Sequence, residues 1–468
     1  MKMSFSRISI WAFAIICFFS AGCANIAAPT GGPRDSIPPV LIQAVPGDST
    51  LNFKSDRIVF TFNEYIDIQN VHENLIVSPT LKNMPIVDHR LRTITVRIKD
   101  TLDPNTTYTF DFGNAIRDIN EGNVFKNFLY LLSTGDYIDT FSLTGKVVLA
   151  ETGKVDSTLI VMLHRNMDDS AVVNERPRYY TRLNGEGYFS FRYLAPGTYR
   201  LFALKDESSL RRYMSPTQLF AFATDSIVVN GNQQPVMLYA YAEEEDEKAG
   251  RTRQQLSISN FIQKADDKRL RYQTNLQGNM QDLLSDLILS FGRPLTNFDS
   301  TKLQLTIGEF KPVYYQFEAD SLNKNFTFKT RWIPDSTYNL IIGQDVGEDS
   351  LGNKLTKTDT LSFRTEMESA YGSLRIKFTN FNPSAKQVLQ LVSNNVVAYS
   401  IPITSGEYFA PLFKPGDYEI RILNDSNGNG IWDPGKFFGE YRQPEIVVSF
   451  EKKLTVRANW ENETTIEL

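Results

Sequence analysis

The sequence has few of the residues that build metal, redox and nucleophilic sites. Its 468 residues include two Cys and three His, which excludes a Cys-rich zinc module and a disulfide framework. His72, His89 and His164 are far apart, and none is near a Ser or Cys in a nucleophile motif. G-x-S-x-G, H-E-x-x-H and phosphate-binding Gly-rich motifs are missing too. We therefore expect no enzymatic activity, although carboxylates distant in sequence could still meet in space.

Excess positive charge and long apolar runs are also lacking. The formal net charge is −5, and losing Lys2 and Arg7 with an N-terminal leader lowers it to −7. Nucleic acid is therefore excluded as a main partner, because phosphate binding needs a basic surface. The apolar run at residues 8–19 is shorter than the roughly 20 residues of a membrane-spanning helix.

The N-terminus instead has the features of a secretory leader. Basic residues, the apolar run and small residues follow one another, as in a signal peptide. Residues 21–23 (AGC) resemble a bacterial lipobox, although Ser20 stands where Leu is usual. The resemblance implies that residues 1–22 are a lipoprotein signal peptide and that Cys23 receives the lipid. An ordinary signal peptide with a chance Cys is the alternative. Cys17 would be lost with the leader.

Two internal repeats divide the rest of the chain. Residues 104–108 (PNTTY) recur 230 positions later as residues 334–338 (PDSTY), and residues 196–199 (PGTY) recur 219 positions later as residues 415–418 (PGDY). The chain is therefore predicted to contain two module pairs in the order A–B–A–B, in which the first repeat marks the A modules and the second repeat marks the B modules. The predicted segments are a Pro- and Gly-containing flexible tether at 23–37, modules at 38–138, 139–242, 256–368 and 369–468, and a charged linker at 243–255.

Alternating apolar and polar residues predict β-strands in both module types. Ile94, Val96 and Ile98 alternate with polar neighbours, and Gly, Pro, Asn and Asp turns separate such segments at short intervals. The 32 Phe and 21 Tyr also favour strands. Helical periodicity is confined to residues 281–286. The predicted fold class is all-β, a tandem of β-sandwiches that bury aromatic residues between sheets without a catalytic cleft.

Module A resembles the bacterial Ig-like domain first described in S-layer proteins. The resemblance lies in residues 59–64 (VFTFNE), 102–113 (LDPNTTYTFDFG) and 118–123 (DINEGN); the second copy replaces Glu64 with Arg293. In module B, residues 185–191 (GEGYFSF) and 194–199 (LAPGTY) resemble the prealbumin-like or carboxypeptidase-regulatory-like β-sandwich. The two ends of the chain also look like those of envelope lipoproteins built on the Ig-like domain. These resemblances imply a fold and are nearly silent on function.

The most distinctive chemistry lies at residues 425–433 (DSNGNGIWD). Oxygen donors follow the spacing of the first nine residues of a calcium loop, with Gly430 at its sharp turn. Lys436 occupies the position of the usual bidentate Glu. We expect either a weak Ca²⁺ site, with a Kd of about 10⁻⁴–10⁻³ M, or an ion-free polar turn. The candidate ligands are Asp425, Asn427, Asn429, Ile431 and Asp433.

Two further features each leave alternatives open. Trp432 lies in this loop, where it would either bind a glycan or protein surface or plug a small β-core. Asp118, Asn120 and Asn123 form another oxygen-rich segment, which we expect to be a polar turn between strands.

The sequence therefore favours a non-enzymatic lipoprotein of the cell envelope. Lipidated Cys23 would hold it in the outer membrane, with the periplasmic or surface side undecided, and the modules would serve as a structural scaffold or bind an envelope protein or glycan. The alternative is a ligand-binding lipoprotein for nutrient or polymer capture, with its site in the calcium-like loop and Trp432. Weakly bound calcium is the one cofactor that the sequence suggests.

Overall fold

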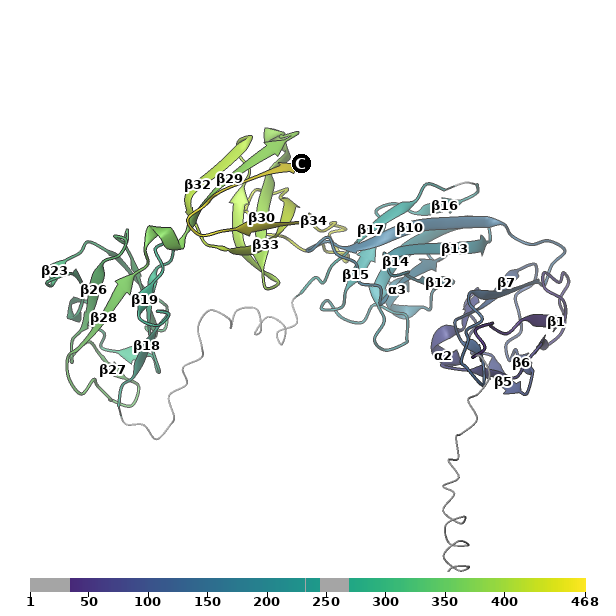
Figure 1. Ribbon diagram of the computed structural model, residues 1–468. Helices are drawn as coiled ribbons and strands as arrows, with labels where there is room; N and C mark the ends of the chain where they lie inside the picture. The colour runs from purple at the N-terminus through teal and green to yellow at the C-terminus, as the bar shows by residue number, and fades with distance from the viewer. Residues whose placement is uncertain (1–33, 232, 245–268) are drawn as a thin grey trace, which may run out of the picture. The chain divides into compact units, whose positions relative to one another are not determined.

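The computed structural model describes residues 34–231, 233–244 and 269–468. Strands predominate in it (Figure 1), and the predicted all-β tandem of β-sandwiches is confirmed. No helix in the described residues is long and apolar enough to cross a membrane. The chain divides into two compact units, Met1–Val77 with Leu81–Ile138 and Ser78–Thr80 with Asp139–Leu468. We call residues 34–138, 139–244, 269–368 and 369–468 the first to fourth modules.

The first module consists of two main sheets. Their strand orders are β1-β2-β6-β5 and β4-β7-β9, and a small β3-β8 pair and one helical turn, α2, complete the module. Its elements are β1 (Leu41–Val45), β2 (Arg57–Phe62), β3 (Ile66–Ile68), α2 (Val71–Asn74), β4 (Ile76–Ser78), β5 (Ile86–Arg90), β6 (Thr93–Arg97), β7 (Thr107–Gly113), β8 (Ile116–Asp118) and β9 (Phe128–Ser133).

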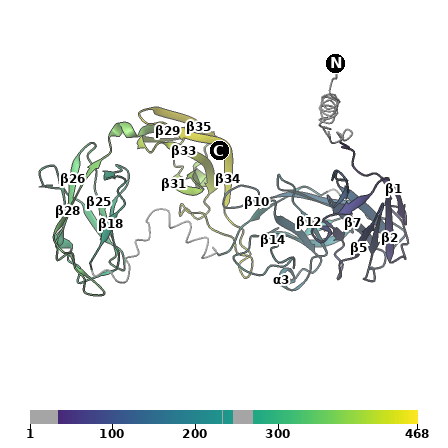
Figure 2. The same ribbon diagram turned by 60° about the horizontal axis from the view of Figure 1, so that its bottom comes forward.

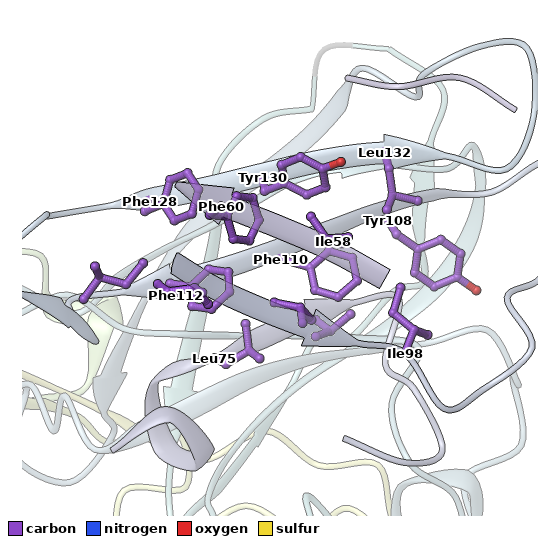
Figure 3. Close-up of a cluster of buried hydrophobic side chains, with 14 of the residues drawn as sticks. Ile58, Phe60, Leu75, Ile98, Tyr108, Phe110, Phe112, Phe128, Tyr130 and Leu132 are labelled. Carbon is purple, nitrogen blue, oxygen red and sulfur yellow. The ribbon is translucent and has the colours of Figure 1, made fainter. Parts of the chain in front are cut away.

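The core of the first module lies between these sheets and is rich in aromatic rings (Figure 3). Successive side chains of a strand point to opposite faces, so that alternate residues of β2 are buried. Phe60 packs edge-on against Phe112, Phe128 and Tyr130, with ring centroids 5.8, 5.0 and 5.0 Å away. The Phe excess of the sequence therefore fills this interior.

The A-type repeat is a turn closed by its own tyrosine. The hydroxyl oxygen of Tyr108 accepts a hydrogen bond from the backbone N–H of Asp103 at 2.9 Å. In the third module, Tyr338 accepts from the N–H of Ile333 at 3.1 Å. The residue after each Pro has a left-handed backbone, with φ of 49° at Asn105 and 52° at position 335, which Asn and Asp tolerate well. The repeated residues therefore form the same tyrosine-closed turn in the first and third modules.

The third module repeats the two-sheet plan of the first. Its sheets have the orders β18-β20-β25-β24 and β19-β28-β26-β22-β23, beside a β21-β27 pair. Its elements are β18 (Tyr272–Thr274), β19 (Met280–Gln281), β20 (Leu287–Phe291), β21 (Leu295–Thr296), η1 (Ser300–Lys302), β22 (Leu303–Ile307), β23 (Lys311–Pro312), β24 (Gln316–Ala319), β25 (Asn325–Lys329), β26 (Thr337–Ile342), β27 (Glu348–Asp349) and β28 (Asp359–Thr365).

The helical periodicity at residues 281–286 does not produce a helix. Gln281 belongs to β19, which pairs in parallel with β28. Its side-chain amide donates to the carbonyl of Ser285 at 2.8 Å, so that the segment closes as a turn instead.

The second and fourth modules share another plan, a three-stranded sheet facing a larger one. In each three-stranded sheet the central strand has a parallel neighbour, β17 beside β10 (Figure 1) and β35 beside β29 (Figure 2). The second module comprises β10 (Phe141–Leu149), β11 (Leu159–His164), α3 (Ala171–Asn174), β12 (Tyr179–Arg182), β13 (Tyr188–Leu194), β14 (Gly197–Lys205), β15 (Phe220–Phe222), β16 (Ile227–Val229) and β17 (Val236–Ala240). The fourth module comprises η2 (Glu368–Ala370), β29 (Gly372–Thr379), η3 (Pro383–Ala385), β30 (Gln387–Ser393), β31 (Val396–Pro402), β32 (Glu407–Phe413), β33 (Gly416–Asn424), β34 (Ile446–Val456) and β35 (Glu461–Glu467).

The B-type repeat also has a local explanation. Gly197 and Gly416 have φ of 149° and 155°, values that favour glycine, at the start of β14 and β33. The hydroxyls of Tyr199 and Tyr418 donate to the backbone carbonyl four residues earlier, at 2.8 and 2.9 Å. Each tyrosine therefore fixes the turn that leads into its own strand.

Candidate functional site

The structure leaves the predicted anchor untested. Residues 1–22, Cys23 and the tether up to residue 33 lie outside the described residues, as does the charged linker from residue 245 onwards. The calcium-like loop, in contrast, is described in full and follows β33.

Asp425 lies at the centre of the calcium-like loop and is 2% exposed. Its Oδ1 accepts a hydrogen bond from the N–H of Gly428 at 2.6 Å, and its Oδ2 accepts from the N–H of Gly430 at 2.7 Å. Both glycines have positive φ, 81° and 80°, which lets the chain curl round the carboxylate. Asp425 thus organises the loop through backbone amides.

The other predicted ligands converge on Asp433. Its Oδ2 accepts hydrogen bonds from the side-chain amides of Asn427 at 2.6 Å and Asn429 at 2.8 Å. The amide oxygen of Asn429 in turn accepts from the N–H of Ile431 at 2.7 Å. A hard cation would bind the amide oxygens instead, so both amides would have to rotate. In the described part of the chain, no three or more His, Cys, Asp and Glu side chains are grouped to hold a metal ion.

Glu445 is a member of this site that the sequence did not indicate. It is 8% exposed, and its Oε1 accepts from the backbone N–H and the hydroxyl of Ser426 at 2.8 and 2.7 Å. Its Oε2 accepts from the N–H of Asp433 at 3.2 Å. The loop is therefore closed by a third carboxylate that lies outside the nine-residue motif.

Trp432 packs inward from the same loop. Its half-buried ring contacts a small cluster formed by Val388, Leu423 and Val447. Its indole N–H donates to the carbonyl oxygen of Glu445 at 2.8 Å. These contacts give Trp432 the packing role that was one of its two alternatives.

The chain that follows the loop joins the fourth module to the second. Phe437 is fully buried, and its ring lies 5.6, 5.3 and 5.0 Å from those of Phe202, Phe220 and Phe222. These three residues belong to β14 and β15 of the second module. The segment at residues 434–447, which we call the docking segment, thus inserts an aromatic side chain into another module.

Polar contacts surround this aromatic insertion. The backbone N–H of Phe437 donates to Glu243 at 3.0 Å, and the amide of Gln443 donates to the carbonyl of Phe222 at 3.0 Å. The N–H of Val447 donates to the carbonyl of Ala150 at 2.8 Å. Buried backbone groups at the junction are therefore paired, as a stable interface requires.

The first module contains the motifs at residues 59–64, 102–113 and 118–123 on which the predicted resemblance rested. Residues 35–132 match the family model of a bacterial Ig-like domain. The predicted resemblance is thereby confirmed, and we call the first module the Ig-like module from here on. No curated protein matches the chain.

Several solved structures share β-rich architecture with the chain at low overall similarity. The BcpA major pilin subunit of Bacillus cereus is 11% identical with a TM-score of 0.18, covering 70% of this chain and 99% of that one. The Bacillus anthracis TIE protein is 10% identical with a TM-score of 0.17, covering 94% and 76%. The N-terminal part of the bacterial S-layer protein SbsC is 16% identical with a TM-score of 0.15, covering 36% and 40%. Scores this low carry no argument about function.

The oxygen-rich turn of the Ig-like module is satisfied by its own backbone. Asp118 is 2% exposed and accepts from the N–H groups of Glu121, Gly122 and Asn123 at 2.6, 2.9 and 2.8 Å. Burial alone would raise the pKa of Asp118, but these hydrogen bonds lower it below its usual value. The segment containing Asn120 is thus a polar turn, as expected.

Proposed function

We propose that the protein is a membrane-anchored, non-enzymatic lipoprotein of the cell envelope. Its tandem β-sandwiches would form a structural scaffold that binds an envelope protein or a glycan. The observation that carries this proposal is the junction between the second and fourth modules. The polar calcium-like loop leads directly into Phe437, which is buried against another module. The position of this loop favours a structural role over a catalytic or ligand-binding one, because buried aromatic contacts fix the orientation of two modules.

The anchor is proposed from the sequence. A diacyl or triacyl Cys23 would insert into the membrane, since a single acyl chain binds only marginally. Residues 24–37, with two Pro and two Gly, would then act as a tether before β1.

Replacing Cys23 by alanine tests the anchor. We expect Cys23→Ala to move the protein from the membrane pellet to the soluble fraction, because the variant cannot receive the proposed lipid. Fractionation after an alkaline wash measures the change. Cys17→Ala is the matched control, since this residue lies in the predicted leader, and the variant should stay in the pellet. A Cys23→Ala protein that stays with the membrane would overturn the proposal.

The outer membrane is the proposed location. Separation of inner and outer membranes on a density gradient tests it, and enrichment in the inner-membrane fraction would contradict it. Protease treatment of intact cells, followed through a C-terminal tag, then reports the side. Loss of the tag places the modules outside, and protection until the outer membrane is opened places them in the periplasm.

A second candidate function is ligand binding at the calcium-like loop. It is favoured by the hydrogen bonds that fold the loop around Asp425 and Asp433, with Glu445 closing the loop through Ser426 and Asp433. On this hypothesis Asn427, Asn429 and the carbonyl of Ile431 would complete the oxygen donors for Ca²⁺. Trp432 would report binding through its fluorescence, because its N–H is bonded to Glu445.

A calcium titration tests this second candidate. We expect the Trp fluorescence of the wild type to change with a Kd of about 10⁻⁴–10⁻³ M, and Asp433→Asn to weaken binding by at least about tenfold. Asp206→Asn is the matched control, because Asp206 is the counterpart of Asp425 in the second module and lacks the rest of the motif. A wild type that does not respond at about 10⁻² M Ca²⁺ contradicts the site.

A further inference from the structure

The outward face of the sheet β1-β2-β6-β5 in the Ig-like module gathers arginines. Ile58 and Phe60 of β2 and Ile94 and Val96 of β6 are buried, so their neighbours along each strand face solvent. Strand pairing places Arg57 directly opposite Arg97, and Arg90 opposite Thr93. Like charges directly opposite each other destabilise a sheet. The pairing of Arg57 with Arg97 is therefore not explained by the stability of the sheet.

A groove of about 820 Å³ lies on this face. We call it the arginine groove. Its size lies within the range of about 300–1,000 Å³ typical of ligand sites. Arginine, threonine and tyrosine, all hydrogen-bond donors, form much of its lining, which includes Tyr65, Arg90, Arg92, Thr93, Thr95 and Arg97.

Acidic side chains lie near two of these arginines, Asp88 beside Arg97 and Glu64 within electrostatic reach of Arg92. Asp88 is 3.6 Å from Arg97, with both side chains more than half exposed at 56% and 53%, a geometry that gives weak pairing. Arg92 lies over the ring of Tyr65, with its guanidinium carbon 5.3 Å from the centroid. Within the described residues, the Arg90 guanidinium makes no hydrogen bond or ion pair. The lining of the groove nevertheless holds more arginines than carboxylates, on a chain whose net charge is −5.

The third module shows that the fold does not need this charge. Leu287 pairs with Phe328 as Ile58 pairs with Val96, which aligns the two sheets residue by residue. The counterparts of Arg57, Arg90, Arg92 and Arg97 are Asp286, Asp320, Lys324 and Lys329.

In the third module, acidic side chains on this face form hydrogen bonds and an ion pair within the module. Asp320 turns its carboxylate to its own hairpin, accepting from the N–H of Lys324 at 2.7 Å and the amide of Asn325 at 2.8 Å. Lys329 pairs with Glu318 at 2.7 Å. One fold therefore carries a basic face in the Ig-like module and a largely neutralised one in its repeat, so this fold can form with either charge pattern.

We propose that the arginine groove binds an acidic polysaccharide through the carboxylates of its sugars. A guanidinium group offers a planar pair of N–H donors that matches a carboxylate, and Arg90 is free to do so. Thr93 and Thr95 line the floor with hydroxyls that suit sugar hydroxyls. The proposal adds a ligand class to the proposed scaffold but depends on the groove alone, whether or not Cys23 carries a lipid.

The lining of the groove favours a glycan over a single-stranded nucleic acid. Single-stranded nucleic acid is bound on rows of exposed aromatic rings, whereas Tyr65 is the one Phe, Tyr or Trp of this lining.

Binding of an oligogalacturonate to the full-length protein in detergent tests the proposal. We expect saturable binding that weakens with added salt, and we expect Arg90→Gln with Arg97→Gln to weaken it at least about tenfold, because each charge-assisted hydrogen bond contributes substantially. Lys324→Gln with Lys329→Gln, at the matched positions of the third module, should leave binding unchanged. Circular dichroism checks that each variant is folded, and Arg57→Gln offers an independent variant at the groove margin.

Several outcomes would overturn the proposal. They are no binding by the wild type, equal binding by the Arg90 and Arg97 variant, equal binding of a neutral oligosaccharide, or preferential binding to phosphatidylglycerol vesicles or DNA. None of these results affects the fractionation of Cys23→Ala, so failure of the groove and failure of the anchor are distinguishable.

Discussion

Replacing Phe437 by alanine is expected to separate the second and fourth modules. The ring is 0% exposed, and it lies within 5.0–5.6 Å of three phenylalanine rings of the second module. Truncating a buried Phe to Ala costs about 3–5 kcal/mol through lost burial and the cavity left behind. We expect the docking of the fourth module on the second to weaken by about the same free energy. Limited proteolysis of the docking segment and chemical denaturation measure it.

Phe438 provides a matched control for this prediction. It adjoins Phe437 in the same segment but is 36% exposed, and its ring is 5.9 Å from that of Tyr213. Phe438→Ala should therefore destabilise the junction much less. If the two variants become protease-sensitive to the same degree, the segment is held by its backbone hydrogen bonds and not by the aromatic insertion.

The elements that could be predicted from the sequence are those whose structure is encoded locally. The turns closed by Tyr108 and Tyr338 need only the residues within one motif, since each hydroxyl bonds a backbone N–H five residues earlier. The same holds for Tyr199 and Tyr418, whose hydroxyls bond carbonyls four residues earlier. These tyrosine-closed turns recur as repeated sequence motifs, so the fold class and the module order could be inferred from them.

The candidate sites depend on contacts that no local pattern reveals. Glu445 reaches Ser426 across a long loop, and the sequence carried no spacing rule that would have indicated it. The Arg57 and Arg97 pair exists only because strand register places two distant residues opposite each other. Phe437 stood in an irregular segment, where an aromatic residue without strand alternation was the one signal that could have suggested burial in another module.

The second prediction with a large expected effect concerns His164 in β11. This residue lies beside Phe202, one of the aromatic residues that surround Phe437. It is 1% exposed, its ring lies 5.7 Å from that of Phe202, and its Nε2 has no hydrogen-bond partner among the described residues. Burial lowers its pKa to about 4, and the charge of Glu175 opposes the shift only in part. The folded protein therefore holds this imidazole neutral.

The sign of the pH dependence follows from that shift. Between about pH 6.5 and pH 4 the unfolded chain binds a proton that the folded chain excludes, so stability falls as the pH falls through this range. A shift of this size corresponds to about 3 kcal/mol, fully present above pH 6.5 and lost towards pH 4.

Unfolding free energies from pH 7.5 to pH 4 check this expectation. Because carboxylates also begin to titrate near the acid end, the informative quantity is the difference between wild type and His164→Gln, which should shrink on acidification. His89→Gln, at a side chain that is 40% exposed, is the control for removing a histidine outside the buried cluster. Parallel curves for wild type and His164→Gln would show that the buried imidazole does not set the acid sensitivity. Because Phe202 contacts both His164 and Phe437, loss of stability at low pH should be accompanied by undocking of the fourth module.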